Sequence, residues 1–354
     1  MTAAAGRRSL PKKPGRRGFV LLAVGVIAVI ALLYVVVPGI AGLDETWARL
    51  LAGDPVWLLA ALLLELLSFA SYVFFFRAVF AGPTGPIDWP ASYRITMAGV
   101  VATRLLAVAG AGGIALTAWA LRRIGLRGRQ VAADMAAFYI LLYGVYMAGL
   151  VGFGFGLYWG IFPGPAPRGL TLVPAIFAAT VIAAVLAIAT LSDDLEAVLA
   201  RFAKGSGASS ARKVLVAIPA TIASGVQGGV SLLRAPRPGL LGAIGWWAFD
   251  VAVLWASLEA FGTAPSVAVI VMAYFVGMLA NTLPIPGGIG AVDGGVIAAL
   301  IGFGVSGGLA IVAVLSYRAF AFWLPIVPGT IAYVQLLRAS ERPGASSSPS
   351  WTHP

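Results

Sequence analysis

The sequence predicts an all-α polytopic membrane protein with about six full spans and two broken, re-entrant helical hairpins in an inverted repeat. Three observations predict this fold. Hydrophobic residues make up 60% of the 354 residues and charged residues only 10%, whereas a soluble domain carries about 25% charged residues. Long apolar runs recur along the chain, separated by short charged or Pro/Gly-rich segments. Two of these runs contain clusters of glycine, which disfavour a continuous helix at membrane depth.

The composition also excludes several kinds of site. The sequence has no cysteine, and its single histidine, His353, lies in a Ser/Pro-rich tail. Disulfides, thiolate or histidine metal sites and a Ser–His–Asp triad in the membrane region are therefore excluded, and no metal or other cofactor is expected. The G-x-G pattern in residues 287–295 lies outside any βαβ unit, so it does not predict dinucleotide binding. With no catalytic constellation, we do not expect an enzyme.

The formal net charge of +11 at pH 7 has two interpretations. In a soluble protein it would indicate nucleic acid. In a membrane protein it indicates positively charged cytoplasmic loops and an affinity for anionic lipid. We favour the second interpretation and expect no nucleic-acid partner.

The first half of the chain begins with a basic segment. Residues 1–18 hold six lysines and arginines between glycines and prolines, which predicts a disordered cytoplasmic arm. Residues 19–37 form an apolar run long enough to span a bilayer, and we favour an uncleaved span over a signal peptide, whose apolar core is usually shorter. Residues 55–76 form the second predicted span, which contains Glu65.

Residues 95–121 are apolar, but the glycine cluster at 110–113 breaks the run in its middle. Arg94 precedes the run and four arginines follow it within residues 122–129. Because cytoplasmic loops are rich in Lys and Arg, both ends are expected inside the cell. This pattern predicts a re-entrant hairpin that turns at the glycines.

The third and fourth spans are predicted over residues 134–156 and 170–191, followed by a charged cytoplasmic segment. Basic residues flank residues 214–233 on both sides, and we interpret this stretch as an interfacial helix rather than as a span.

The last spans are predicted over residues 239–261 and 309–337. Trp246 and Trp247 lie near the inner end of the first of these, where an interfacial aromatic belt is expected. Residues 339–354 are predicted to be a disordered tail, so that residues 19–338 form a single transmembrane domain with both termini in the cytoplasm.

The second break lies in the apolar region 265–300, where residues 281–295 read NTLPIPGGIGAVDGG. Proline removes a backbone donor and clashes with the preceding turn, so one unbroken helix is excluded. Irregular backbone at membrane depth is tolerated only where it is buried in protein or lines a wet cavity. Transporters build substrate sites at such breaks, which predicts a binding site here.

The two broken segments superpose when the chain is aligned with itself so that Arg104 falls on Asn281. This alignment also places Gly110 on Gly287 and Gly113 on Gly290, and the flanking apolar runs match in order. Chance coincidence competes with this interpretation because the chain has 44 glycines. We interpret the match as a repeat, with one copy at about residues 55–156 and the other at about 232–337. If residues 192–241 are cytoplasmic, the hairpins enter from opposite sides and meet near the midplane.

Residues 283–300 (LPIPGGIGAVDGGVIAAL) and 316–329 (SYRAFAFWLPIVPG) resemble the second-half signature of the lysylphosphatidylglycerol synthase transmembrane-region family, also called flippase-like. Residues 111–125 are similar to its first-half segment. The resemblance implies a functional acid at Asp293, where the family has a glutamate. Many relatives carry charged residues in the first-half motif, whereas this chain has Ile114 and Thr117. The chain ends shortly after its last span, so we expect no aminoacyl-transferase domain and no lysine transfer.

Three charged residues are the main site candidates. Asp293 could be a functional acid at membrane depth, a cap for the helix that starts after Gly290, or both. Arg318 could pair with Asp293 or bind a lipid phosphate. Arg104 could supply a second cation, or its side chain could snorkel to the cytoplasmic face.

The other candidates are polar side chains and the backbone of the break. Asn281 and Thr282 could donate hydrogen bonds to a lipid head group. Glu65 and Asp250 could line a polar path, or form ordinary hydrogen bonds between helices. The residues that form the break itself are Pro284, Pro286, Gly287, Gly288 and Gly290.

Together these features predict a translocase of lipids or lipid-linked substrates, with its site at the second broken helix near the midplane. An accessory or enzyme subunit in membrane lipid or polyprenyl-glycan assembly is the alternative, and a small-solute secondary transporter is the third. The expected partners are membrane phospholipids, chiefly anionic ones, together with a lipid-modifying enzyme or a second copy of the chain. The expected location is a bacterial-type plasma membrane.

Overall fold

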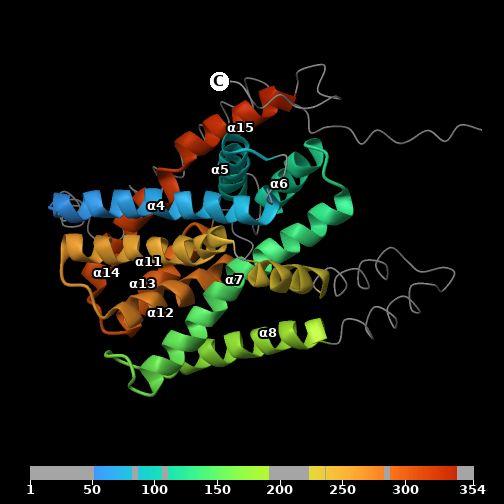
Figure 1. Cartoon of the computed structure of the whole chain (residues 1–354). Helices are drawn as coiled ribbons and strands as arrows, with labels where there is room; N and C mark the ends of the chain where they lie inside the picture. The colour runs from blue at the N-terminus through green and yellow to red at the C-terminus, as the bar shows by residue number, and fades with distance from the viewer. Residues whose placement is uncertain are drawn as a thin grey trace, which may run out of the picture. The chain divides into compact units, whose positions relative to one another are not determined.

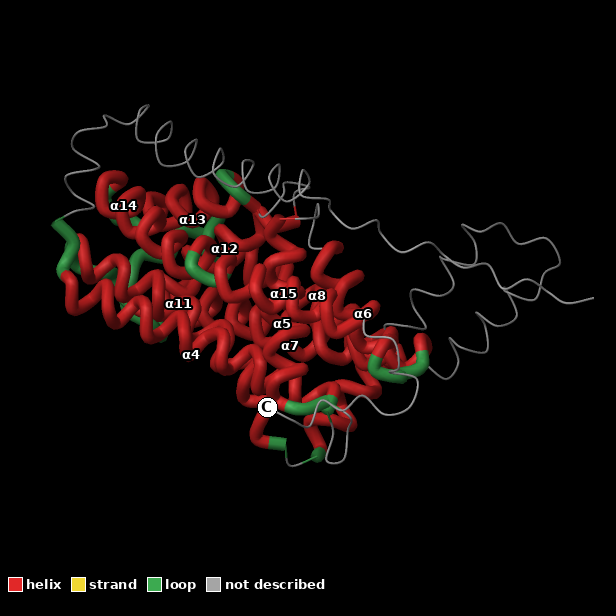
Figure 2. The backbone as a smooth tube through the Cα atoms, turned by 90° about the horizontal axis from the view of Figure 1, so that it is seen from above, coloured by secondary structure: helices red, strands yellow, loops and turns green. Residues whose placement is uncertain are grey.

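The computed structural model of the chain describes residues 52–81, 87–105, 111–190, 223–235, 237–282 and 288–340. Within these residues every regular element is a helix and none is a strand (Figure 2). The helices below all belong to one compact unit, Gly53–Pro354. The predicted basic arm, the first span over residues 19–37 and nearly all of the tail lie outside the described residues.

Four of the described helices are long and apolar enough to cross a membrane, which confirms a polytopic all-α membrane protein. They coincide with the predicted spans that begin near residues 55, 134, 239 and 309. They comprise Pro55–Phe80, Gly128–Tyr158, Pro238–Phe261 and Gly307–Ala339. At the predicted fourth span, α8 (Leu172–Thr190) is a shorter apolar helix. Residues 223–233 of the stretch interpreted as interfacial are helical, and their position relative to a membrane stays a prediction.

The first half is built from four helices, α4 (Pro55–Phe80), α5 (Trp89–Leu105), α6 (Ala111–Arg123) and α7 (Gly128–Tyr158). The start of α4 follows directly from its sequence. Asp54 accepts a hydrogen bond from the backbone N–H of Val56 at 2.8 Å, and Pro55 occupies the first turn, where its missing N–H costs nothing.

The break predicted in residues 95–121 separates two helices, α5 and α6, that pack against each other. The turn predicted at residues 110–113 is wrong in position, because Gly112 and Gly113 belong to α6. A glycine makes their close approach possible. A Cβ added at Gly113 would lie 2.6 Å from the carbonyl oxygen of Gly99, so any larger residue would push the two helices apart.

The second half repeats this order of elements. It contains α11 (Gly242–Phe261), α12 (Val267–Met278) with the short helix η4 (Leu279–Thr282), and α13 (Ala291–Gly302). The last long segment consists of α14 (Gly307–Arg318), a π-helical turn η6 (Ala319–Trp323) and α15 (Ile326–Ser340). Here too a glycine permits close packing, since a Cβ at Gly277 would lie 2.5 Å from the backbone nitrogen of Val296.

The alignment that places Arg104 on Asn281 also relates the helices of the two halves. It carries α5 (89–105) to residues 266–282, where α12 and η4 together cover 267–282. It carries α6 (111–123) to 288–300, where α13 covers 291–302, and α7 (128–158) to 305–335, where α14 to α15 cover 307–340. The same sequence of helices thus occurs twice.

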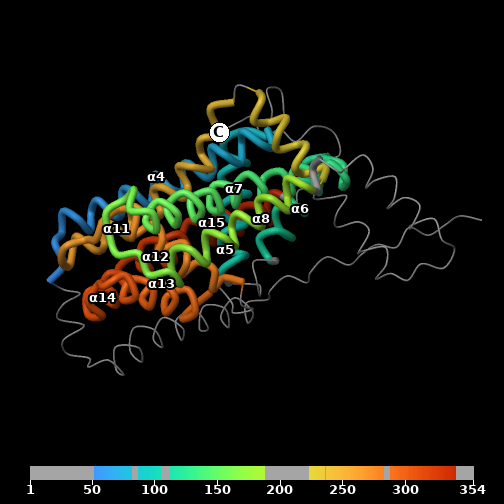
Figure 3. The backbone as a smooth tube through the Cα atoms, turned by 90° about the horizontal axis from the view of Figure 1, so that it is seen from below, coloured from blue at the N-terminus to red at the C-terminus, as the bar shows by residue number. Residues whose placement is uncertain are grey.

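The packing between the halves follows the same relation. The long helices α4 and α11 pack along each other and lie side by side in Figures 1 and 3. Helix α5 packs against α15, and its counterpart α12 packs against α7. Each half therefore places its first short helix on the last long helix of the other half, which brings residues from both halves to one site.

Candidate functional site

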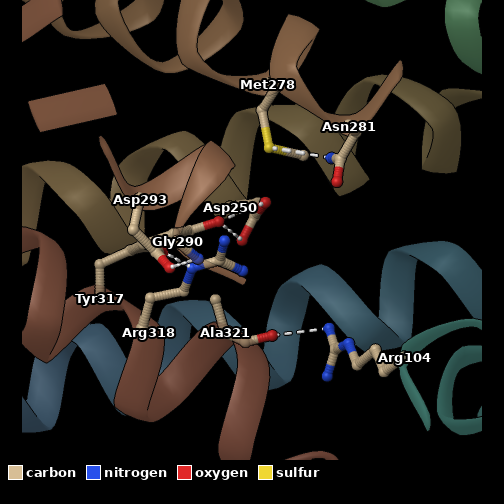
Figure 4. Close-up of polar contacts among 9 residues, drawn as sticks. All are labelled: Arg104, Asp250, Met278, Asn281, Gly290, Asp293, Tyr317, Arg318 and Ala321. Carbon is tan, nitrogen blue, oxygen red and sulfur yellow. Dashed lines mark hydrogen bonds and ion pairs between the residues drawn. The ribbon is translucent and has the colours of Figure 1, made fainter. Parts of the chain in front are cut away.

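The site contains the predicted pair of Asp293 and Arg318 (Figure 4). The Nε of Arg318 donates to Asp293 Oδ1, and the two side chains are only 14% and 15% exposed. Asp293 Oδ2 also accepts the backbone N–H of Gly290 at 2.9 Å, directly before α13 begins. Gly290 has φ +81°, a conformation that favours glycine. Asp293 is thus both a helix cap and the partner of a largely buried arginine.

Arg104, at the end of α5, reaches the bend in the last long segment. Its Nη2 donates to the carbonyl oxygen of Ala321 at 2.6 Å, and its Nη1 donates to that of Phe322 at 2.9 Å. Four residues after Ala321 the chain has Pro325, which has no N–H to continue the helical ladder. The guanidinium of Arg104 replaces that donor. Because its guanidinium binds these two carbonyl oxygens, Arg104 does not extend away from the site, as it would if it snorkelled to the cytoplasmic face.

The ring of Phe322 lies next to both arginines. The Cζ of Arg104 is 5.2 Å from the ring centroid, and the Cζ of Arg318 is 5.3 Å from it. Cations at these distances are attracted to the face of an aromatic ring. Phe322 therefore helps to hold the two cations, one from each half, at the same place.

Two carboxyl groups from α4 and α11 form the acidic part of the site. Asp250 accepts hydrogen bonds from the hydroxyl groups of Tyr274 and of Tyr317, the latter at 3.2 Å. Glu65 is 1% exposed and lines the same cavity as Asp250, because α4 packs against α11. Its Oε2 is buried and has no hydrogen-bond partner. The structure thus brings Glu65 and Asp250 together, as the packing of α4 on α11 requires.

A cavity of about 570 Å³ is lined by Glu65, Asp250, Arg104, Arg318, Tyr317 and Phe322, whereas Asp293 and Tyr274 do not line it. Arg318 contributes a buried Nη2 that has no hydrogen-bond partner. The second break contributes Asn281 and Gly288, while Pro284, Pro286 and Gly287 lie outside the described residues. The aromatic residues of the remaining wall include Tyr72, Phe76, Phe138, Tyr139, Tyr143, Trp246 and Trp247.

The tryptophans differ from their prediction. Trp247 is 6% exposed, and its Nε1 donates to the carbonyl oxygen of Leu142 at 2.8 Å, so it is a buried wall residue and no part of an interfacial belt. Trp246 is half-buried, with its ring 5.3 Å from that of Phe69. In an apolar helix, sequence cannot separate a belt tryptophan from one that packs inside the bundle.

Two candidates have weaker roles. The Nδ2 of Asn281 is 3.6 Å from the sulfur of Met278, and the side chain is otherwise exposed at the cavity. Thr282 donates to the carbonyl oxygen of Leu279 at 2.8 Å and does not line the cavity. Within the part of the chain that is described, no group of acidic residues or histidines is arranged to hold a metal ion.

Sequence analysis did not single out Tyr274, Tyr317 or Phe322. All three lie in strongly apolar segments, where aromatic residues usually serve packing alone. The only signal available was the position of Tyr317 next to Arg318 in the motif at residues 316–329.

Comparison with known families gives one match. Residues 20–329 match the family described as "Lysylphosphatidylglycerol synthase TM region", and this range contains every site residue described above. No curated protein matches the chain.

Proposed function

The chain belongs to the lysylphosphatidylglycerol synthase transmembrane-region family, and from this premise we propose that it is a lipid translocase. The family and the apolar helices make it a membrane protein concerned with lipids. In our proposal the cavity between the two halves holds a phosphate-bearing head group, while the acyl chains remain in the bilayer.

One observation carries this proposal. The Nη2 of Arg318 is buried and has no hydrogen-bond partner, and Arg318 is one of the residues that line the cavity. A buried donor without a partner costs about 1–3 kcal/mol, and a phosphate oxygen is the acceptor that suits a guanidinium best. The volume of about 570 Å³ lies within the usual range for small-ligand pockets.

A second cavity supports a path for the acyl chains. It measures about 420 Å³ and is lined only by apolar residues and glycine from α7, α11 and α12. Trp247 lines both cavities, so the apolar cavity adjoins the one that contains the arginines. A lipid with its head group beside Arg318 could place an acyl chain on the other side of Trp247.

The repeated packing suggests how the site would open to each side. In our proposal the two halves have inverted topology in the plasma membrane, with both termini in the cytoplasm, and one half rocks against the other. The first helix of each short hairpin would move with a long helix of the opposite half, because α5 packs against α15 and α12 packs against α7. The cargo would be phospholipid, and anionic lipids would benefit most from the two arginines.

Reconstitution in liposomes tests this proposal. We expect the full chain to move fluorescently labelled phosphatidylglycerol between leaflets, measured as label that a membrane-impermeant reductant can reach. Arg318→Gln should slow this movement about tenfold to a hundredfold, because a charge-assisted hydrogen bond contributes about 1.5–3 kcal/mol and each 1.4 kcal/mol is a factor of about ten.

The matched control is Arg168→Gln, since Arg168 is exposed and does not line the cavity. It should leave the rate unchanged. Vesicles with wild-type protein that are no faster than protein-free vesicles would contradict the function. Equal rates for wild type and Arg318→Gln would contradict the site.

A further inference from the structure

The charges of the candidate site do not balance. The cluster holds three carboxyl groups, on Glu65, Asp250 and Asp293, and two guanidinium groups, on Arg104 and Arg318. If all five groups were ionised, the cluster would carry one net negative charge, as 3 − 2 = 1. An uncompensated charge among helices that cross a membrane is costly, so such a cluster favours binding one more cation.

The hydrogen bonds show where that cation would bind. Asp293 already has Arg318 and the N–H of Gly290. Asp250 already has two tyrosine hydroxyl groups. Glu65 has a buried Oε2 that no donor reaches. The unbalanced charge thus belongs to the Glu65–Asp250 pair, and chiefly to Glu65.

No arginine completes this pair among the described residues. The ion pair at the site is the one between Arg318 and Asp293. Arg104 is near Glu65, but its two terminal nitrogens donate to the carbonyl oxygens of Ala321 and Phe322. Besides these cations, the titratable groups around the pair are Tyr274, Tyr317, Tyr72, Tyr139 and Tyr143.

A proton is the cation that fits these surroundings. Burying a carboxylate that lacks a donor costs far more than burying a neutral carboxyl group. Two carboxyl groups that lie close together also disfavour double ionisation and share a proton. We propose that Glu65 and Asp250 bind one proton between them, and that this proton is the ion coupled to lipid movement. The coupling to lipid movement rests on the proposed function.

The sign of the coupling follows from the charges. Binding adds a proton to a carboxylate and gives a carboxyl group; release returns the proton to water in the cavity. A phosphate that enters beside Arg318 adds negative charge to the cluster and so favours the protonated pair. Proton and lipid head group should therefore bind together and cross together.

The proton site can be tested without any transport assay. The infrared spectrum of the purified full-length protein near neutral pH should contain the carbonyl stretch of a protonated carboxyl group. This band should be lost in Glu65→Gln and altered in Asp250→Asn. Glu259→Gln, a matched change in α11 at a residue that does not line the cavity, should leave it intact. Absence of the band in the wild type, as expected if Glu65 instead awaits a head-group amine, would overturn the proposal.

Coupling is tested in the same liposomes with an imposed pH gradient. For one proton per lipid, a gradient of one pH unit should shift the transmembrane distribution of labelled phosphatidylglycerol about tenfold, away from the acidic side. If the pH gradient does not change the transmembrane distribution of labelled lipid in vesicles with the wild-type protein, the coupling is overturned, even if the infrared band is present. If the wild type moves no lipid at all, the proposed function falls, and the infrared spectrum still decides whether the proton is bound.

Discussion

Replacing Arg104 with methionine should destabilise the fold through the bend in the last long segment. Methionine keeps an apolar stem but cannot donate to the carbonyl oxygens of Ala321 and Phe322, which Arg104 binds at 2.6 and 2.9 Å. Hydrogen bonds from a charged donor contribute about 1.5–3 kcal/mol each, so the two together give an upper estimate of about 3–6 kcal/mol for the loss in unfolding free energy.

A second substitution tests the reason for this loss. Pro325→Ala supplies the N–H that the carbonyl of Ala321 lacks in a regular helix, so it should restore part of the stability in the Arg104→Met background. In the wild-type background the carbonyl oxygen of Ala321 already accepts a hydrogen bond from Arg104, so Pro325→Ala should add little to the free energy of unfolding. The double-mutant cycle should therefore give a favourable interaction energy of about 1–2 kcal/mol, within the usual range for residues that share a partner.

The assay is unfolding in mixed micelles by titration with sodium dodecyl sulfate, followed by tryptophan fluorescence. Pro328→Ala is the matched control, because the carbonyl four residues before Pro328 belongs to Leu324, to which Arg104 does not donate. Its effect should add to that of Arg104→Met. If Pro325→Ala is equally additive, then Arg104 does not replace the donor that proline removes, and the account of this bend is wrong.

Three further substitutions probe the hairpin and the ion pair of the second half. Gly277→Ala should destabilise the protein by about 1–3 kcal/mol, as overpacking does, because its Cβ would lie 2.5 Å from the backbone nitrogen of Val296; Gly294→Ala, with open space around it, should stabilise by up to about 1 kcal/mol. The same unfolding titration measures both, and equal signs would contradict the close packing of α12 on α13. Asp293→Asn should slow lipid movement in liposomes several-fold while α13 keeps its cap, since asparagine can still accept the N–H of Gly290; an unchanged rate would remove Asp293 from the site.

The sequence predicted the breaks and the Asp293–Arg318 pair because their signals are local. Proline and clustered glycine disfavour a continuous helix, and charged residues at membrane depth need partners. The sequence could not predict in the same way that Glu65 on α4 and Asp250 on α11 lie at the same site. Helices α4 and α11 are apolar on all sides, so no periodic pattern shows which face of each points inward.

The partners of Arg104 depend on a still less local feature. They require α5 to pack against the last long segment, in the other half of the chain, and they require a π-helical turn at that segment. No apolar pattern encodes such a contact. Pro325 is visible in the sequence, but the sequence does not show which donor replaces its missing N–H.

The helices recur in the two halves of the chain, but the charged residues of the site do not, and this difference bears on the mechanism. When the two halves are aligned with Arg104 on Asn281, the helices and their packing recur, but no charged residue of the site meets a charged counterpart. Glu65, Arg104, Asp250, Asp293 and Arg318 correspond to Gly242, Asn281, Val73, Leu116 and Leu141.

A bundle with symmetric packing can exchange the roles of its halves at little cost in packing energy. An asymmetric charged cluster cannot, because its excess negative charge would face a different environment in each state. Neutralising that charge with a proton would bring the two states closer in free energy. In the proposed transport cycle, the asymmetry of the charges is therefore a physical reason for the exchange between states to depend on protonation of the Glu65–Asp250 pair.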